Sequence, residues 1–221
     1  MPGIAGSMAR FVVVNKFLYA VNMVSLLAFD IENEANPVRK SESYIGGRMI
    51  ETIYPFGNSL FIGSSDGLFI YNIDDPASPS QKGSFVHARA CDPVVSDGEH
   101  AFVTLRSGDA CAGNADQLDV IDVSDLTNPH LVKTYPLSNP KGLGKDGDLL
   151  FVCDADEGIK VFDAADVNQL KLVNQIKDLE AFDVIPWGGR LMVSATDGLH
   201  QYDYSDHTNI KLLSRIQIAA E

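Results

Sequence analysis

Hydrophobic and polar positions follow the same order in five successive segments of this chain. The repeats align on an Asp or Asn, with spacings of 42, 50, 41 and 40 residues: Asp30, Asn72, Asp122, Asp163 and Asp203. An aliphatic residue lies four positions before each of these: Leu26, Leu68, Leu118, Ile159 and Leu199. A second Asp or Asn follows three positions after: Asn33, Asp75, Asp125, Asp166 and Asp206. A period near 40 residues with strand-like patterning is typical of a β-propeller.

The fifth repeat shows the pattern of one unit most clearly. Two apolar runs, 181–186 and 191–195, precede two alternating segments, 199–204 and 211–218. Turn signals such as Asp197-Gly198 separate these segments. The pattern predicts four antiparallel strands, termed A to D, which together make one propeller blade.

We therefore expect an all-β fold, a β-propeller of five four-stranded blades with negligible helix, in a single domain over residues 1–221. The expected blades cover residues about 8–46, 47–87, 88–138, 139–178 and 179–218. The repeats begin on a strand A and end on a strand D, so each blade is complete. We therefore expect no strand from one end of the chain to join a blade at the other end. A closed five-blade ring, with blade 5 packed against blade 1, is favoured. Membership of a larger propeller is the alternative.

Three local patterns have two interpretations each. Residues 168–176 could form a helix alone, but their alignment with the other D strands favours a strand. The paired Asp and Asn residues of each repeat could bind a metal ion, but such side chains commonly fix turns by accepting backbone N–H bonds. Residues 154–158 resemble the start of a calcium loop but lack the later Glu, so a B–C turn is favoured. We expect no metal site and no cofactor.

Composition narrows the class of partner. The formal net charge of −13 argues against nucleic-acid binding, which needs a basic surface. No apolar run approaches the length of a membrane span, so no direct membrane insertion is expected. Residues 1–7 contain neither the basic region nor the apolar region of a signal peptide, so no signal peptide is expected in this chain.

Residues 118–129, Leu-Asp-Val-Ile-Asp-Val-Ser-Asp-Leu-Thr-Asn-Pro, and more loosely residues 68–76, resemble the LVIVD-repeat family of bacterial surface β-propellers. The resemblance covers nearly the whole chain. It implies a cell-envelope or extracellular protein, often a lipoprotein, with no established activity.

The starts of the A strands carry one charged residue per blade: Arg10, Glu51, Asp92, Lys141 and Asp183. In a propeller these positions surround one mouth of the central channel, where ligand sites are favoured. The charges are either solvated around a wet channel or form a ring that grips a cation, a sugar or a basic peptide.

Blade 3 is the exception among the repeats. Its B–C connection, residues 106–117, is about nine residues longer than its counterparts, and such loops often carry function. A further group of candidate ligand-binding residues could converge there: His87, Arg89, Asp92, Arg106 and Asp109. A disulfide between Cys91 and Cys111 could pin this loop. Cys153 is the competing partner, or a buried apolar residue.

No catalytic constellation emerges from these residues. We therefore favour a non-enzymatic binding or scaffold module, with an unknown protein, peptide or glycan engaged at the channel mouth near blade 3. The alternative is a glycan-active hydrolase or lyase that uses the carboxylates Glu51, Asp92 and Asp183. Glycosidase chemistry would require two of them about 5–10 Å apart.

Overall fold

The computed structural model of the chain describes residues 6–46, 49–86, 93–108 and 116–218. Twenty strands form five four-stranded antiparallel sheets, in each of which the strands follow one another in chain order. The one helical element among the described residues is the three-residue 3₁₀ turn η1 (Ala155–Glu157). None of the described helical structure is long and apolar enough to cross a bilayer. The expected all-β, five-blade propeller is confirmed.

Each sheet lies within one sequence repeat. Blade 1 comprises β1 (Phe11–Val14), β2 (Phe17–Val21), β3 (Ser25–Asp30) and β4 (Val38–Tyr44). Blade 2 comprises β5 (Ile50–Phe56), β6 (Ser59–Ser64), β7 (Gly67–Asn72) and β8 (Ser80–Val86). Blade 3 comprises β9 (Val94–Ser96), β10 (His100–Leu105), β11 (Gln117–Asp122) and β12 (His130–Pro136). Blade 4 comprises β13 (Pro140–Asp146), β14 (Leu149–Asp154), β15 (Ile159–Asp163) and β16 (Lys171–Ile176). Blade 5 comprises β17 (Ala181–Trp187), β18 (Arg190–Ala195), β19 (Gly198–Asp203) and β20 (Lys211–Gln217).

Local chemistry explains where these strands end. In every blade the first Asp or Asn of the repeat accepts a hydrogen bond from the backbone N–H two residues later, and so does the second, at 2.9–3.2 Å. At Asp203, donation from the Ser205 hydroxyl and then from its N–H lowers the pKa of the carboxyl. The turn interpretation of this motif is confirmed, and the segment at residues 168–176 contains strand β16 rather than a helix.

The core lies between blades rather than inside them. Four clusters of buried apolar side chains join blade 1 to 2, 2 to 3, 3 to 4 and 4 to 5. An aromatic residue of strand B is buried at each of these four junctions: Tyr19, Phe61, Phe102 and Phe151. Burial of large aromatic rings supplies much of the apolar stabilisation in such a core.

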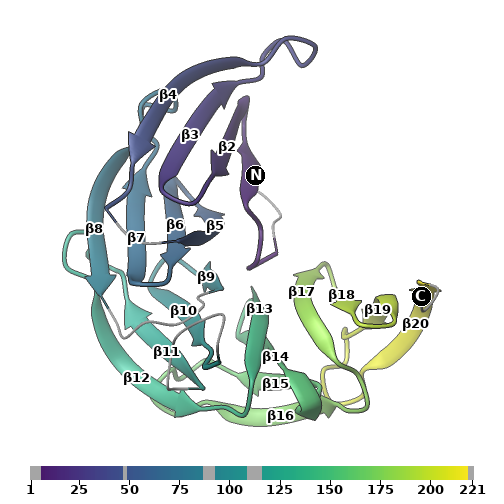
Figure 1. Ribbon diagram of the computed structural model, residues 1–221. Helices are drawn as coiled ribbons and strands as arrows, with labels where there is room; N and C mark the ends of the chain where they lie inside the picture. Colours follow the sequence, from purple (N-terminus) through teal and green to yellow (C-terminus); the bar gives the residue numbers. More distant parts are fainter. Residues whose placement is uncertain (1–5, 47–48, 87–92, 109–115, 219–221) are drawn as a thin grey trace.

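The five blades lie around a ring, with the A strands β1, β5, β9, β13 and β17 nearest its centre (Figure 1). Adjacent blades pack through their inner strands from blade 1 to blade 5. Among the described residues, no comparable strand packing joins β17 to β1 or β2. The segment that precedes β1 instead reaches blades 4 and 5, because Ser7 hydrogen-bonds to Leu143 and Asp183. The junction between blades 5 and 1 is thus built differently from the other four.

Candidate functional site

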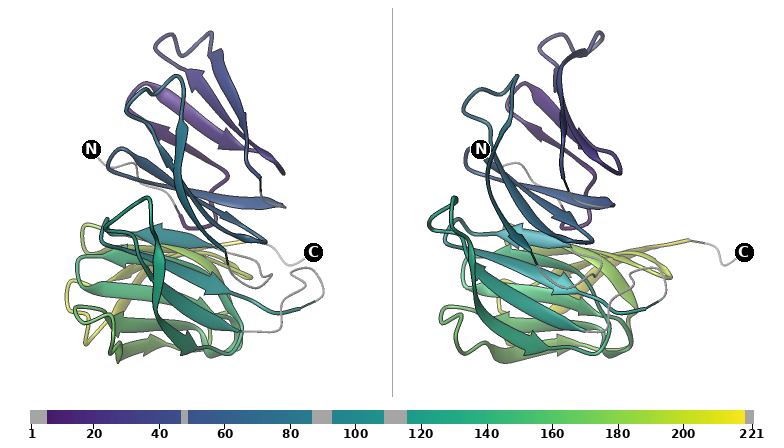
Figure 2. Two further views of the ribbon diagram at one scale, coloured as in Figure 1. Left: turned by 90° about the vertical axis from the view of Figure 1, so that its left-hand side faces the viewer. Right: turned by 60° about the vertical axis from the view of Figure 1, so that its left-hand side comes forward.

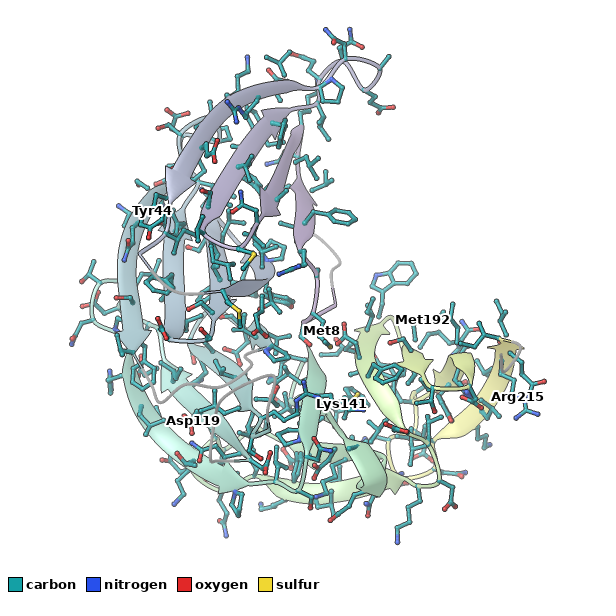
Figure 3. All side chains as sticks on the ribbon, in the orientation of Figure 1. Met8, Tyr44, Asp119, Lys141, Met192 and Arg215 are labelled. Atoms are coloured by element: carbon teal, nitrogen blue, oxygen red, sulfur yellow. The ribbon has the colours of Figure 1, made fainter. Side chains whose placement is uncertain are left out.

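A pocket of about 520 Å³ opens where the A strands begin. Charged, apolar and small residues line it: Met8, Arg10, Met23, Met49, Glu51, Thr52, Pro93, Arg106, Pro140, Lys141 and Phe182. They come from the starts of A strands, the segments that lead into them and the B–C connections. Met8 and Lys141 lie near the centre of the ring in Figure 3. The pocket therefore occupies the channel mouth that the repeat alignment indicated.

Four of the candidate residues line this pocket. Arg10 lies just before β1, Glu51 and Lys141 lie at the second positions of β5 and β13, and Arg106 follows β10. They come together because corresponding strands of successive blades start at the same end of the ring. The structure thus brings together charges that lie up to 131 positions apart in the sequence, from Arg10 to Lys141.

Lys141 is held in place rather than free in solvent. Its ammonium lies 3.0 Å from a carboxylate oxygen of Glu180 and 4.5 Å from the centre of the Phe182 ring. Arg10 is fixed in a similar way, because its Nη2 donates to the carbonyl of Ile50 at 3.0 Å. A cation placed over an aromatic face is attracted by the ring quadrupole. These contacts orient two positive charges at the pocket wall.

The apolar side of the pocket was missed by the sequence analysis. Met8, Met23, Met49 and Phe182 contribute it, and all four side chains remain substantially exposed. Methionine adapts its shape to irregular partners and is common at binding surfaces. Their positions at the same end of the strands as Arg10 were a usable signal, which the pattern of charged residues alone does not reveal.

Asp183 has a different environment from the other A-strand charges. It does not line the pocket, and its carboxylate accepts hydrogen bonds from the Ser7 hydroxyl at 2.8 Å and from the Met8 N–H at 3.4 Å. Ser7 in turn accepts the Leu143 N–H at 2.8 Å. Burial raises the pKa of Asp183 to about 6, against the effect of these hydrogen bonds. Asp183 therefore anchors the N-terminal segment to blades 4 and 5.

Two glycines make room for this carboxylate. A Cβ atom on Gly6 or on Gly142 would overlap the carboxylate oxygens of Asp183. A larger residue at either position would force the Asp183 carboxylate or the substituted backbone to move. The anchor thus depends on close approach of three separate parts of the chain.

Several predicted residues of blade 3 lie outside the described residues: His87, Arg89, Cys91, Asp92, Asp109 and Cys111. The predicted convergence of the charged residues, and the predicted disulfide, therefore stay predictions. The base of the long B–C connection is described. Ser107 donates to the Asp116 carboxylate through its backbone N–H at 2.9 Å and through its hydroxyl at 2.7 Å. These bonds tie the two ends of the loop together beside Arg106.

Other candidate chemistries have structural explanations. Residues 154–158 form the B–C turn of blade 4, as favoured, and the buried Asp154 accepts bonds from Lys160, Ser138 and Asn139. Cys153 is buried with a free thiol, and burial raises its pKa well above the ordinary value. Within the described ranges, no group of three or more His, Cys, Asp or Glu residues could hold a metal ion.

The three carboxylates of the enzymatic alternative have different surroundings. Glu51 lines the pocket, Asp183 is buried beside the N-terminal segment, and Asp92 lies outside the described residues. Where the chain is described, the pocket wall therefore holds one acidic and three basic side chains.

Solved structures resemble this chain in fold. A protein from Lactobacillus plantarum is 16% identical with a TM-score of 0.68, over 90% of this chain and 67% of that one. The periplasmic gluconolactonase PpgL of Pseudomonas aeruginosa is 16% identical with a TM-score of 0.68, over 92% of this chain and 68% of that one. The computationally designed protein Ika8 is 12% identical with a TM-score of 0.68, over 93% and 60%. At these identities the likeness shows the fold alone, and the chain spans 60–68% of the length of these structures.

No curated protein sequence matches the chain. The LVIVD repeat is found at residues 50–86 and 107–136, which correspond to blade 2 and to the latter part of blade 3. These are the two blades whose strand C sequences carry the resemblance noted above. The chain is thus a five-blade β-propeller with LVIVD repeats, as is consistent with the LVIVD family.

Proposed function

We propose that this protein is a binding module that receives an apolar group of a partner, flanked by charge, in the channel-mouth pocket. A peptide segment of a partner protein suits such a wall best, and a glycan is the other class of ligand. The proposal includes a place in the bacterial cell envelope, which rests on the family resemblance, and a non-enzymatic role.

The observation that carries the proposal is the composition of the pocket wall. Met8, Met23, Met49 and Phe182 supply adaptable apolar surface, and the oriented charge of Lys141 lies beside it. The volume of about 520 Å³ lies within the range of about 300–1,000 Å³ typical of ligand pockets. Apolar surface with a few placed polar groups is the usual composition of such sites.

Blade 3 contributes to this wall through Pro93 and Arg106. Arg106 stands at the start of the long B–C connection, whose ends Ser107 and Asp116 hold together. Blade 3 therefore contributes to the pocket wall through Arg106, at the described base of its long B–C connection.

Peptide and glycan arrays provide the first test, followed by calorimetric titration of each ligand that binds. Replacement Phe182→Ala removes the aromatic part of the apolar wall and the ring that faces Lys141, so we expect affinity to fall at least about tenfold. Phe56→Ala is the matched control. Phe56 and Phe182 have nearly equal exposed fractions, 37% and 38%, but Phe56 lies at the other end of its A strand and does not line the pocket.

Equal losses of affinity in both variants would contradict a site in this pocket. Product formation from any bound glycan would contradict the non-enzymatic role and would favour the hydrolase or lyase alternative. Mass spectrometry of the glycan after incubation with the protein measures that outcome directly.

A further inference from the structure

Each blade has a face that meets the following blade, called here its forward face. Strand B contributes one residue to it in every blade: Tyr19, Phe61, Phe102, Phe151 and Met192. Strand C contributes another: Leu26, Leu68, Leu118, Ile159 and Leu199. In blades 1 to 4 these side chains are 0–1% exposed, because the next blade covers them. In blade 5, Met192 is 41% exposed and Leu199 is 48% exposed.

The opposite, backward face meets the preceding blade. Strand A contributes an equivalent residue to this face in each blade: Phe11, Ile53, Val94, Leu143 and Val184. Four of these residues are at most 1% exposed, whereas Phe11 in blade 1 is 66% exposed. Blade 1 therefore has an uncovered backward face and blade 5 an uncovered forward face.

The two uncovered faces are complementary in kind. At the four packed junctions a forward face lies against a backward face, and apolar residues from both form one buried cluster. The forward face of blade 5 adds Ile216, and the backward face of blade 1 adds Val13, both exposed. Exposed contiguous apolar surface of this kind marks an interaction site.

Within one molecule these two faces do not meet through their strands. The segment Gly6–Met8 lies at the inner edge of this junction, where Asp183 binds Ser7 and Met8. Figure 1 shows the ribbons of β1 and β17 diverging outward from this edge, and Figure 3 places Met192 on blade 5. Figure 2 shows the same separation from two other sides, with blades 1 and 2 above blades 3 to 5.

We propose that the forward face of blade 5 binds the backward face of blade 1 in a second copy of this chain, head to tail. A second copy is favoured as the occupant for two reasons. The contact extends an interface that already occurs four times within the molecule, and one chain supplies both complementary faces. Because the two faces differ, the association is heterologous, and it produces either a closed ring of copies or an open series.

Two single variants test this arrangement, each of which disables one face. Phe11→Glu places a charge on the backward face of blade 1, and Leu199→Glu places one on the forward face of blade 5. Sedimentation velocity should show concentration-dependent assembly of the unaltered chain and a monomer for each variant alone. An equimolar mixture of the two variants should form a dimer and nothing larger, because it contains one intact pair of faces.

Leu131→Glu is the matched control, because Leu131 is 45% exposed but lies on the outer strand β12, away from both faces. This variant should assemble as the unaltered chain does. Circular dichroism should show the same strand content and melting temperature for all variants at dilute concentration. All three sites are exposed, so the fold does not depend on them.

Three results would overturn the proposal. An unaltered chain that remains a monomer at all concentrations would show that no second copy binds. Dimerisation of either variant alone would show that like faces pair. If the Leu131→Glu variant fails to assemble as the other two variants do, the contact would lie on the outer rim instead.

Discussion

Blade 5 meets its two neighbours in different ways. Towards blade 4, Leu191, Val193 and Tyr202 pack into an apolar cluster, and the rings of Phe151 and Tyr204 meet edge to face at 5.0 Å. Towards blade 1, the described contact is a set of hydrogen bonds at the inner edge, centred on Asp183. The same repeat sequence thus produces a packed junction on one side and a polar anchor on the other. The hydrophobic pattern of a repeat makes the face of a blade apolar, but that face becomes part of the core only where another blade covers it.

The largest difference should appear when equivalent residues are truncated. Phe151→Ala removes a fully buried ring and leaves a cavity, so the free energy of unfolding should fall by about 3–5 kcal/mol. Met192→Ala alters the same position in blade 5, where the side chain is 41% exposed, and should cost less than about 1 kcal/mol. Urea unfolding of both variants at a concentration where the chain is monomeric measures this. Similar losses would contradict the distinction between the two junctions.

The polar anchor should give the junction of blades 5 and 1 a pH dependence. Burial raises the pKa of Asp183 from 3.8 to about 6, so the folded state binds this proton more tightly than the unfolded state. The contribution of this group is full below about pH 4 and is lost as pH rises through 6. Relative to Asp183→Asn, the unaltered chain should lose up to about 3 kcal/mol between pH 4 and 7.

Asp206→Asn is the control for that measurement. Asp206 is exposed, and hydrogen bonds from the Thr208 hydroxyl and then its N–H lower its pKa, so its contribution is present near neutral pH and is lost as pH falls. The control should therefore differ from the unaltered chain in the opposite direction and in a more acidic range. If the free energies of unfolding of the unaltered chain and of Asp183→Asn change with pH in parallel, Asp183 does not change its protonation on unfolding, and the account of the anchor is wrong.

The sequence predicted the blades because their signals are local. Alternation of apolar residues, and an Asp or Asn that accepts a bond two residues later, define strands and turns without any distant contact. The charged part of the pocket was also predictable, since Arg10, Glu51 and Lys141 lie at or just before the starts of the A strands of blades 1, 2 and 4.

The remaining features depend on distant parts of the chain. Met192 and Phe151 are both apolar at equivalent positions, and the one local difference on this face is that Met192 pairs with Gln201 where Phe151 pairs with Val161. Asp183 resembled Glu51 as an A-strand charge, but its partner Ser7 lies 176 positions away. Whether a side chain is buried against such a partner depends on how the blades assemble into the ring. The sequence pattern of a single repeat does not predict that assembly.

Hydroxyl-radical footprinting with mass spectrometry, on the dilute monomer and on a concentrated sample, tests the open junction most directly. Phe11 and Met192 should be oxidised rapidly in the dilute sample and should become protected as copies associate, while Tyr19 and Phe151 should stay protected throughout. Protection of Phe11 and Met192 in the dilute monomer would contradict the account, because it would show that blades 5 and 1 pack within one molecule.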